Sequence, residues 1–291
     1  MMSSRTSSPK RSPGADGLSR RAVLAGGAAV LLSACSGGPT PVVGPPAAAP
    51  PTEPTLLAQP VTVQRMRSHA RSTDVDLVLI APSGIPTTGL PVCLVLHGRG
   101  AKARTMLELG LPDMLNVAVQ AGTPPFALAA VDGDHYWVDV GNGDDPQRML
   151  TDEMPGWLAQ RSLKPASAVF GISMGGFGAL RFAREHRELR AVATASAALF
   201  TSWPDAKARK VFAGEDQWKA EEPLLHTGEL RAEGTGIWCG DGDPFLTADR
   251  RLIKALGPEV SRISPGAHND EYWRGVLPDV LKFVGERVKD S

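Results

Sequence analysis

The octet GISMGGFG at residues 171–178 places four glycines around one serine, Ser173. The residues before it, 166–170, are small or apolar, and a helical pattern follows, so the octet joins a predicted strand to a predicted helix. Glycine weakens strands and helices, so four glycines in so short a stretch need a structural reason. A sharp strand-to-helix turn that presents a serine hydroxyl, the nucleophile elbow, requires small flanking residues. The octet therefore predicts such an elbow, with a simple glycine-rich turn as the alternative.

Short apolar runs alternate with helical patterns from residue 61 to the end of the chain. Eight strands are predicted, at 61–68, 74–82, 91–98, 126–133, 167–173, 191–199, 234–243 and 260–268. Helices are predicted at 146–161, 175–186, 247–257, 270–288 and 105–122, the last with Pro112 as a candidate kink. This alternation predicts an α/β fold: a mostly parallel eight-stranded sheet with helices on both faces and an antiparallel hairpin of the first two strands at one edge. Residues 203–230 break the alternation and are interpreted as a helical insertion over the C-terminal edge of the sheet.

The first 34 residues have the pattern of an export signal. Two consecutive arginines precede an apolar run of about a dozen residues, which is too short to span a bilayer. The run ends in LSAC, and the segment resembles the twin-arginine signal and lipobox of bacterial lipoproteins, in which the cysteine, here Cys35, receives lipid. We predict a signal peptide at 1–34, a lipidated N-terminus and Pro/Ala-rich tether at 35–60, and a folded domain at 61–291. The protein is expected at the outer face of the cell membrane; a Sec-type signal and a membrane-anchored helix are the alternatives.

Charge and cysteine content narrow the classes of protein further. Lys and Arg number 31 and so do Asp and Glu, so the chain lacks the basic footprint of a nucleic-acid-binding protein. Removal of residues 1–34 would leave a net charge of −4, so membrane attachment would rest on acyl chains rather than on anionic headgroups. Cys93 and Cys239 lie in predicted core strands that are placed apart in the sheet, and both are expected to be free thiols. No cysteine or histidine cluster indicates a metal site, and no cofactor is expected.

A serine nucleophile needs a base, and the base needs an acid that orients it. In an elbow fold the acid and the base follow the serine in chain order, each in a loop after a strand. The loop GDGDPF offers Asp241 and Asp243, and the later loop SPGAHND offers His268. Asp243 is the preferred acid, while Asp241 is expected to hydrogen-bond within the turn and stays the alternative.

Two backbone N–H groups are expected to stabilise the oxyanion of an acyl-transfer reaction. One belongs to Met174, the residue after the serine. The other comes from the turn LVLHGRGA after the third predicted strand, where Arg99 is the preferred donor and Gly100 the alternative. His97 in the same turn is interpreted as a structural hydrogen-bonding residue.

Aromatic residues mark two candidate pocket walls. The loop after the fourth predicted strand, whose C-terminal end should face the ligand crevice, carries His135, Tyr136 and Trp137. The insertion adds a candidate lid or acyl-pocket wall from Trp203, Phe212 and Trp218. Plain loop packing is the alternative for both groups.

With these motifs, residues 61–288 resemble the α/β-hydrolase superfamily, specifically the group that contains esterase D (S-formylglutathione hydrolase), feruloyl and acetyl-xylan esterases and the secreted mycolyltransferases. The resemblance rests on GISMGGFGAL, on GDPF and on the loop of His268. It implies a serine hydrolase in which Ser173 is the nucleophile, Asp243 the acid and His268 the base. It places Arg99 at the oxyanion turn.

The resemblance implies a carboxylesterase that acts on short-acyl, sugar or lipid esters through an acyl-enzyme. Two alternatives stay open: an acyltransferase that moves an acyl group to an envelope sugar or lipid, as mycolyltransferases do, and an inactive hydrolase fold that binds a ligand. The sequence lacks a clear acidic and basic pair for trehalose, which favours hydrolysis over transfer. All three residues of a triad are present, which disfavours the inactive binding protein.

Overall fold

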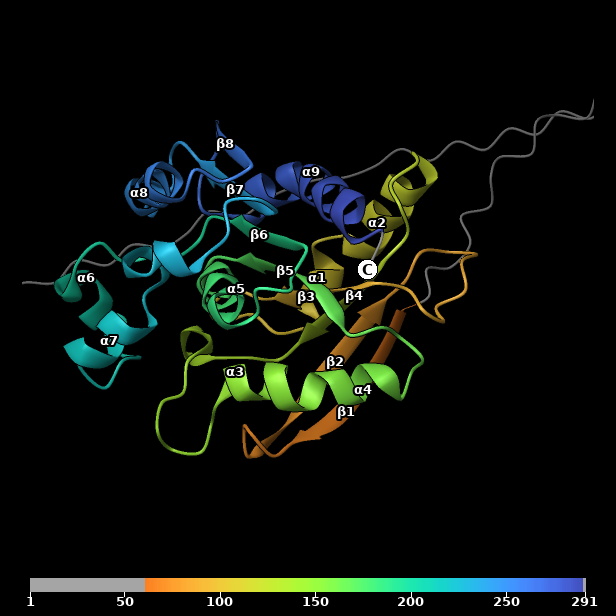
Figure 1. The fold of residues 1–291 in the computed structure, drawn as a ribbon, viewed down its shortest axis with the longest axis horizontal. Helices are drawn as coiled ribbons and strands as arrows, with labels where there is room; N and C mark the ends of the chain where they lie inside the picture. The colour runs from red at the N-terminus through yellow and green to blue at the C-terminus, as the bar shows by residue number, and fades with distance from the viewer. Residues whose placement is uncertain (1–60, 290–291) are drawn as a thin grey trace, which may run out of the picture. The chain divides into compact units, whose positions relative to one another are not determined.

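The computed structural model describes residues 61–289. The predicted signal peptide, Cys35 and the tether lie outside the described residues and stay predictions. Within the described part, eight strands form one sheet in the order β1-β2-β4-β3-β5-β6-β7-β8 (Figure 1). The strands are β1 Val61–Ser68, β2 Thr73–Ile80, β3 Val92–Leu96, β4 Ala127–Val131, β5 Ala166–Ile172, β6 Ala191–Ala195, β7 Thr235–Gly240 and β8 Val260–Ser264.

Strand directions match the predicted α/β fold. Strand β2 runs antiparallel to both of its neighbours, β1 and β4, so β1 and β2 form the expected edge hairpin. The six strands from β4 to β8 in sheet order pair in parallel. The prediction of a mostly parallel eight-stranded sheet is therefore confirmed. Two predicted strands, 191–199 and 260–268, end four residues too late. After β6 the buried small residues 196–199 continue the apolar run into a loop, whereas residues 265–268 after β8 are exposed or half-buried.

The helices lie between the strands as the alternation predicts, with corrections inside two of them. Their bounds are α1 Thr105–Glu108, α2 Leu111–Gln120, α3 Pro146–Arg148, α4 Met154–Ala159, α5 Met174–Glu185, α6 Trp203–Lys207, α7 Glu215–Glu221, α8 Leu246–Leu256 and α9 Asp270–Val288. The predicted helix 105–122 is two helices, because Gly110 adopts a left-handed φ of 89° between them. Pro112 does not kink a helix; it lies in the first turn of α2, where proline interrupts no hydrogen bond. The predicted helix 146–161 is divided by a π-helical turn, Met149–Glu153.

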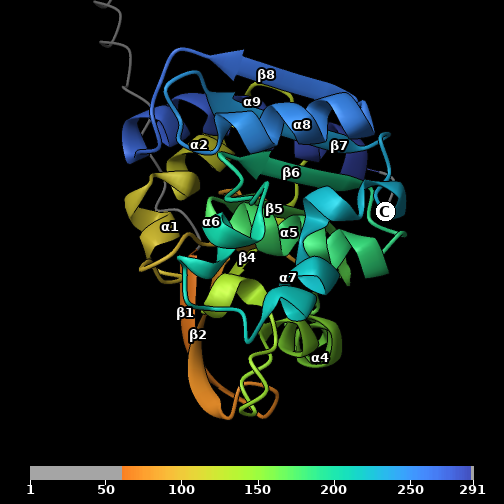
Figure 2. The same cartoon turned by 90° about the vertical axis from the view of Figure 1, so that its left-hand side faces the viewer.

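Alternating side chains divide the interior into two hydrophobic layers, one on each face of the sheet. On β3, Leu94 and Leu96 belong to one layer, while Cys93 and Val95 belong to the other. Helices α4, α5 and α8 pack on the Leu94 side, and α1, α2 and α9 pack on the opposite side (Figures 1 and 2). The carboxyl ends of the parallel strands therefore meet at one edge between two helical layers, the position where ligands bind in open α/β sheets.

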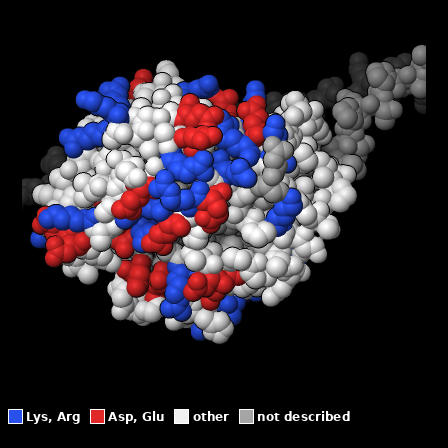
Figure 3. Space-filling view, in the orientation of Figure 1, with Lys and Arg blue, Asp and Glu red and all other residues white. Residues whose placement is uncertain are grey.

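The two described cysteines are free, as predicted. Cys93 on β3 and Cys239 on β7 are separated in the sheet by β5 and β6. Burial raises the pKa of both thiols well above the ordinary value, so both are protonated and unreactive. Among residues 61–289, no helix is long and apolar enough to cross a membrane, and no group of His, Cys, Asp and Glu side chains could hold a metal ion. Basic and acidic side chains lie interleaved on the face shown in Figure 3.

Candidate active site

Ser173 lies between the end of β5 and the start of α5, in the strand–serine–helix turn expected from the octet. Its φ of 55° and ψ of −116° are strained for a residue with a side chain. Glycines make the close approach of strand and helix possible. A Cβ on Gly171 would lie 1.9 Å from the carbonyl oxygen of Gly175, and a Cβ on Gly175 would lie 1.9 Å from the carbonyl oxygen of Leu96. The glycines are therefore steric requirements of the turn.

His268 and Asp243 complete a hydrogen-bonded chain with Ser173. The Nε2 atom of His268 lies 2.8 Å from Oγ of Ser173, and its Nδ1 atom lies 2.8 Å from Oδ2 of Asp243. Asp243 follows β7 and His268 follows β8, so both come from loops at the same edge of the sheet. The side chain of Asp243 is fully buried, whereas that of His268 is 22% exposed. This arrangement allows the imidazole to accept the serine proton while the carboxylate stabilises the imidazolium.

The two aspartates of the GDGDPF loop have different partners. Asp241 does not reach His268; its Oδ1 atom accepts the N–H of Gly266 at 3.1 Å. Asp243 accepts hydrogen bonds from His268, from the N–H of Phe245 at 2.8 Å and from Ser196. Burial alone would raise the pKa of Asp243, but these hydrogen bonds outweigh it and hold the pKa below its ordinary value. Asp243 is therefore the carboxylate held ionised next to the imidazole.

Ser196 and Trp273 form a second layer around Asp243 that the sequence reasoning missed. The indole Nε1–H of Trp273 donates to Oγ of Ser196 at 3.1 Å, and Ser196 in turn hydrogen-bonds the carboxylate of Asp243. The Trp273 ring also packs edge-on against the ring of His268, with 5.2 Å between centroids. The one sequence signal for Ser196 is a polar residue within the small apolar run ATASAAL. A serine in such a run carries no motif of its own.

His97 ties together the loops after β3 and β4. Its Nε2 atom accepts the N–H of Gly133 at 2.9 Å, and its Nδ1 atom lies 2.8 Å from the carbonyl oxygen of Gly98. Burial lowers the pKa of His97 below its ordinary value, so the imidazole is neutral, with Nδ1–H as the donor to Gly98. The geometry agrees with the structural role expected for His97.

The two predicted oxyanion donors belong to segments that adjoin Ser173. Met174 is the first residue of α5, where a backbone N–H has no acceptor within the helix. The turn that contains Arg99 approaches the serine closely, because a Cβ on Gly98 would lie 3.4 Å from Cβ of Ser173. The positive end of the α5 dipole points to the same place. Both N–H groups therefore remain candidates for binding an oxyanion, and no contact excludes Gly100.

A cavity of about 500 Å³ opens directly at Ser173 and His268. Its apolar lining includes Met106, Leu109, Ile172 and Trp273. Its lining also includes the turn residues Arg99 and Gly100, the aromatic residues Tyr136 and Phe245, and the charged residues Arg209 and Asp270. The cavity thus joins the hydrogen-bonded chain to a surface that could hold both parts of a small ester.

Of the three residues expected at the pocket after β4, Tyr136 lines this cavity, whereas His135 and Trp137 do not. Trp137 is fully buried under Gly133 and Gly178, because these glycines leave space for its indole ring. His135 points away from the cavity toward Asp144, with 3.8 Å between its Nε2 atom and the carboxylate. The prediction of pocket contacts for His135 and Trp137 is therefore corrected to roles in loop structure.

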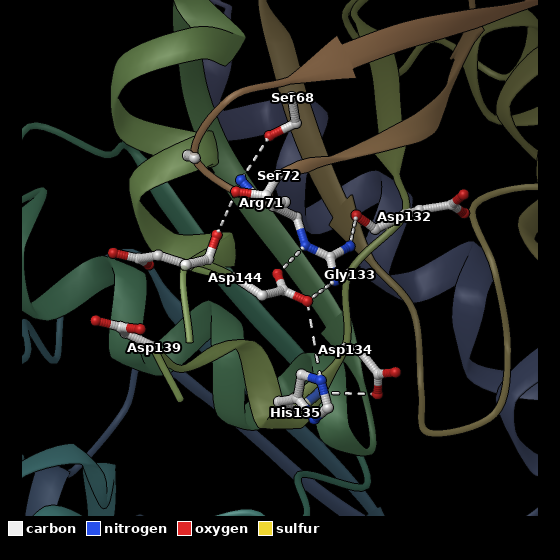
Figure 4. A network of polar contacts seen from close by, with 12 residues as sticks. Ser68, Arg71, Ser72, Asp132, Gly133, Asp134, His135, Asp139 and Asp144 are labelled. Atoms are coloured by element: carbon white, nitrogen blue, oxygen red, sulfur yellow. Dashed lines mark hydrogen bonds and ion pairs between the residues drawn. The ribbon is translucent and has the colours of Figure 1, made fainter. Parts of the chain in front are cut away.

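A buried arginine fixes this loop (Figure 4). Arg71 lies between β1 and β2, and its guanidinium donates two hydrogen bonds to the carboxylate of Asp144, at 2.6 and 2.9 Å. A third hydrogen bond, at 2.9 Å, reaches the carbonyl oxygen of Asp132 at the end of β4. Because one rigid fork clamps both ends of the loop, the side chain of His135 is held on the Asp144 side while Tyr136 faces the cavity.

The aromatic residues of the insertion pack against each other and against neighbouring aromatic rings rather than covering the serine. Trp203 and Trp218 contact each other, and Phe212 packs against Tyr136 and Phe177. None of the three insertion aromatics lines the cavity at Ser173, so packing, the alternative interpretation, describes them in this structure. The insertion instead contributes Arg209 to the cavity lining.

The fold and the site geometry define a protein of the α/β-hydrolase class. The family model described as "Putative esterase" matches residues 68–284, about three quarters of the chain. The chain therefore belongs to this esterase family, whose members act on ester bonds.

Relatives in sequence and structure agree with that assignment. The chain is 34% identical over 186 residues to the diacylglycerol acyltransferase/mycolyltransferase Ag85A of Mycobacterium tuberculosis, a match that covers 48% of this chain and 55% of the relative. The chain thus spans about half the length of the mycolyltransferases that it matches. Among solved structures, it resembles an S-formylglutathione hydrolase from Agrobacterium tumefaciens with a TM-score of 0.67 at 18% identity, over 80% of this chain and 97% of that one. It also resembles a ferulic acid esterase with a TM-score of 0.63 at 21% identity, over 79% and 98% of the two chains.

Proposed function

We propose that this protein is a serine carboxylesterase in which Ser173, His268 and Asp243 act as the catalytic triad. The observation that carries the proposal is the continuous hydrogen-bonded chain of these three side chains, at 2.8 Å for each link, beside an open cavity. The membership of the esterase family supports the reaction class independently of the geometry.

The reaction begins with attack of Oγ of Ser173 on the ester carbonyl carbon while Nε2 of His268 takes the hydroxyl proton. The carbonyl oxygen becomes an oxyanion, which the N–H groups of Arg99 and Met174 stabilise by about 3 kcal/mol per donor. The tetrahedral intermediate then expels the alcohol, which receives the proton from His268, and leaves an acyl-enzyme. Water attacks the acyl-enzyme with His268 again as the base, releases the carboxylic acid and regenerates the serine.

A fluorophosphonate probe and a panel of 4-nitrophenyl esters of graded acyl length test this proposal. The probe should label the wild type at Ser173, and Ser173→Ala should lose both labelling and hydrolysis. Asp243→Asn should lower kcat/KM by about 10⁴-fold. Asp241→Asn is the matched control, because Asp241 contacts Gly266 instead of the imidazole, and it should stay within a few-fold of wild type. Hydrolysis by Ser173→Ala near the wild-type rate would overturn the assignment, and a folded, inactive wild type would favour the ligand-binding alternative.

Acyl transfer is the second candidate, because the sequence relatives are described as diacylglycerol acyltransferases and mycolyltransferases. Transfer uses the same acyl-enzyme, but an acceptor alcohol replaces water in the second step. Product analysis by mass spectrometry, with and without sugar and diacylglycerol acceptors, separates the two reactions. An acylated acceptor would establish transfer, whereas free acid alone at saturating acceptor would exclude it for that acceptor.

We further propose that the protein is exported and anchored to the outer face of the cell membrane through lipid on Cys35. The support for this proposal is the LSAC sequence after the apolar run. Cells fed an alkyne-labelled fatty acid should yield labelled wild type, while Cys35→Ala should be unlabelled and released from the membrane fraction. Equal labelling of both would refute lipidation at this residue.

A further inference from the structure

Two arginines line the cavity at Ser173 without an acidic partner among the described residues. Arg99 belongs to the turn after β3, and Arg209 belongs to the insertion just after α6. Within residues 61–289, no carboxylate lies within ion-pair distance of either guanidinium. Other arginines of this part of the chain do have such partners, for example Arg71 with Asp144 and Arg181 with Glu221. The cavity therefore offers positive charge that the protein itself does not neutralise.

Arg209 is held in place by aromatic rings rather than by a counter-ion. Its guanidinium carbon lies 5.2 Å from the ring centroid of Phe245 and 5.7 Å from that of Phe200. Phe245 in turn contacts His268, with 5.2 Å between the ring centroids. The ring of Phe245 therefore contacts both the guanidinium of Arg209 and the imidazole of His268. Stacking uses the face of a guanidinium and leaves its edge N–H groups free to bind an anion.

The charges around the cavity favour an anion. Burial raises the pKa of Tyr136, the charges of Arg209 and Arg99 lower it and that of Glu222 raises it, so both guanidinium groups act on this cavity-lining hydroxyl. Asp270 also lines the cavity, but it lies 3.8 Å from the guanidinium of Arg274 one helical turn later. Among the charged side chains that line the cavity, the two guanidinium groups of Arg99 and Arg209 therefore outnumber the one carboxylate, Asp270.

A second cavity of about 530 Å³ is also lined by Arg209. The two cavities share Arg209, Pro244 and Phe245 in their walls. Asp205 lines the second cavity and accepts a hydrogen bond from the hydroxyl of Ser202. A substrate with a charged group at Arg209 could extend from the serine past the arginine into this space.

We propose that the preferred substrates are esters that carry an anionic group, a carboxylate or a phosphate, which Arg209 binds with support from Arg99. This inference rests on the proposed esterase function and deepens it, because it names the charge of the substrate. An apolar group of the same ester would lie against the Met106 and Leu109 side of the cavity. The anionic group is on the acyl part or on the alcohol part of the ester, and the experiment separates these two cases.

Matched pairs of esters test the proposal. For the acyl part, the pair is 4-nitrophenyl hydrogen adipate and its methyl ester, which share one leaving group. For the alcohol part, the pair is 4-acetoxybenzoate and its methyl ester, and 4-acetoxyphenyl phosphate adds the phosphate case. Rates are divided by the alkaline hydrolysis rate of each compound. We expect the wild type to favour the anionic member of at least one pair by about tenfold or more in kcat/KM, the scale of one hydrogen bond to a charged group. The preference should fall as ionic strength rises.

Variants at the two arginines test whether they cause the preference for anionic esters. Arg209→Gln should reduce the ratio of anionic to neutral kcat/KM about tenfold or more, and Arg209→Lys should restore part of it. Arg251→Gln is the matched control: it removes the same charge from an exposed position on α8, outside both cavities, and should leave the ratio unchanged. Arg99→Gln, which keeps its backbone N–H, should reduce the ratio less than Arg209→Gln. Thermal unfolding monitors the fold of each variant, and Arg209→Lys and Arg99→Gln carry the test where Arg209→Gln does not fold.

The outcomes separate this inference from the proposed function. Hydrolysis that depends on Ser173 but shows no anionic preference in any pair would overturn the inference and leave the esterase assignment intact. A wild-type ratio in Arg209→Gln would likewise overturn the role of Arg209. Failure of folded wild type to hydrolyse any of the esters would overturn the proposed function and the inference with it.

Discussion

Replacement of Gly175 by alanine tests whether the glycines of the octet are steric requirements for presenting Ser173. The added Cβ would lie 1.9 Å from the carbonyl oxygen of Leu96 and 2.9 Å from that of His97. Real Cβ atoms essentially never come within 3.0 Å of another heavy atom, so α5 and β3 must separate by about 1 Å. Both elements bear on the site, because Met174 begins α5 and the turn with Arg99 follows β3.

The expected cost has two parts. Forcing extra volume into this contact should lower the free energy of unfolding by about 1–3 kcal/mol or more. A displacement of about 1 Å between the serine and the oxyanion donors should lower kcat/KM by about 100-fold. Urea unfolding measures the first part, and hydrolysis of a 4-nitrophenyl ester measures the second, on the fraction of protein that remains folded.

Gly275→Ala is the matched control for this experiment. Gly275 lies within α9, and a Cβ there would meet no atom within 4 Å. Alanine should therefore stabilise α9 by about 0.5–1 kcal/mol and leave kcat/KM unchanged, because glycine is a poor helix former. The reasoning is refuted if Gly175→Ala matches the wild type in both stability and kcat/KM.

Two further predictions concern buried polar groups. Ser196→Ala leaves Asp243 with one hydrogen-bond donor fewer and the indole N–H of Trp273 without its acceptor. We expect the unfolding free energy to fall by about 1.5–3 kcal/mol and kcat/KM to fall tenfold or more. Wild-type values of both quantities would contradict the support role of Ser196. Burial raises the pKa of Glu222 from 4.5 to about 7, so its carboxyl binds a proton more tightly in the folded state, and the contribution of this one group to stability should grow as the pH falls from 8 to 5. The contribution of the Glu222 carboxyl is about 3 kcal/mol at most. The difference in unfolding free energy between wild type and Glu222→Gln should therefore change with pH by up to that amount. A difference that stays constant with pH would contradict the raised pKa of Glu222.

The fold could be predicted because its main determinants are local in the sequence. The strands β3, β4 and β6 are runs in which every residue is buried, and such runs stand out from the polar segments around them. The elbow was equally visible, because a strand–serine–helix turn demands several glycines in one octet. The proximity of Asp243 and His268 to Ser173 could be predicted from chain order, since consecutive parallel strands deliver their loops to the same edge of the sheet.

The predictions failed where a tertiary contact decided the outcome. Trp137 is an aromatic residue in a loop expected to line the pocket, but Gly133 and Gly178 leave a space in the interior that its indole ring fills. The direction of His135 depends on Arg71, which lies more than sixty residues away in the chain and clamps the loop through Asp144. Neither Gly178 nor Arg71 could be paired with this loop from sequence spacing alone, because their segments become neighbours of the loop after β4 only when the sheet forms.

Arg209 shows most sharply why substrate preference lies beyond sequence motifs. It stands in DAKARKVF, between Lys207 and Lys210, and nothing in that segment distinguishes it from a solvated charge. The distinction arises in three dimensions, where Phe200 from the loop after β6 and Phe245 from the loop after β7 support one guanidinium and leave the lysines outside the cavity. Catalytic groups in this fold must meet a fixed geometry and therefore follow a pattern, whereas a group that binds the remote part of a substrate can come from any loop that reaches the cavity. The charge of the substrate is thus decided by a residue whose role only the packed structure reveals.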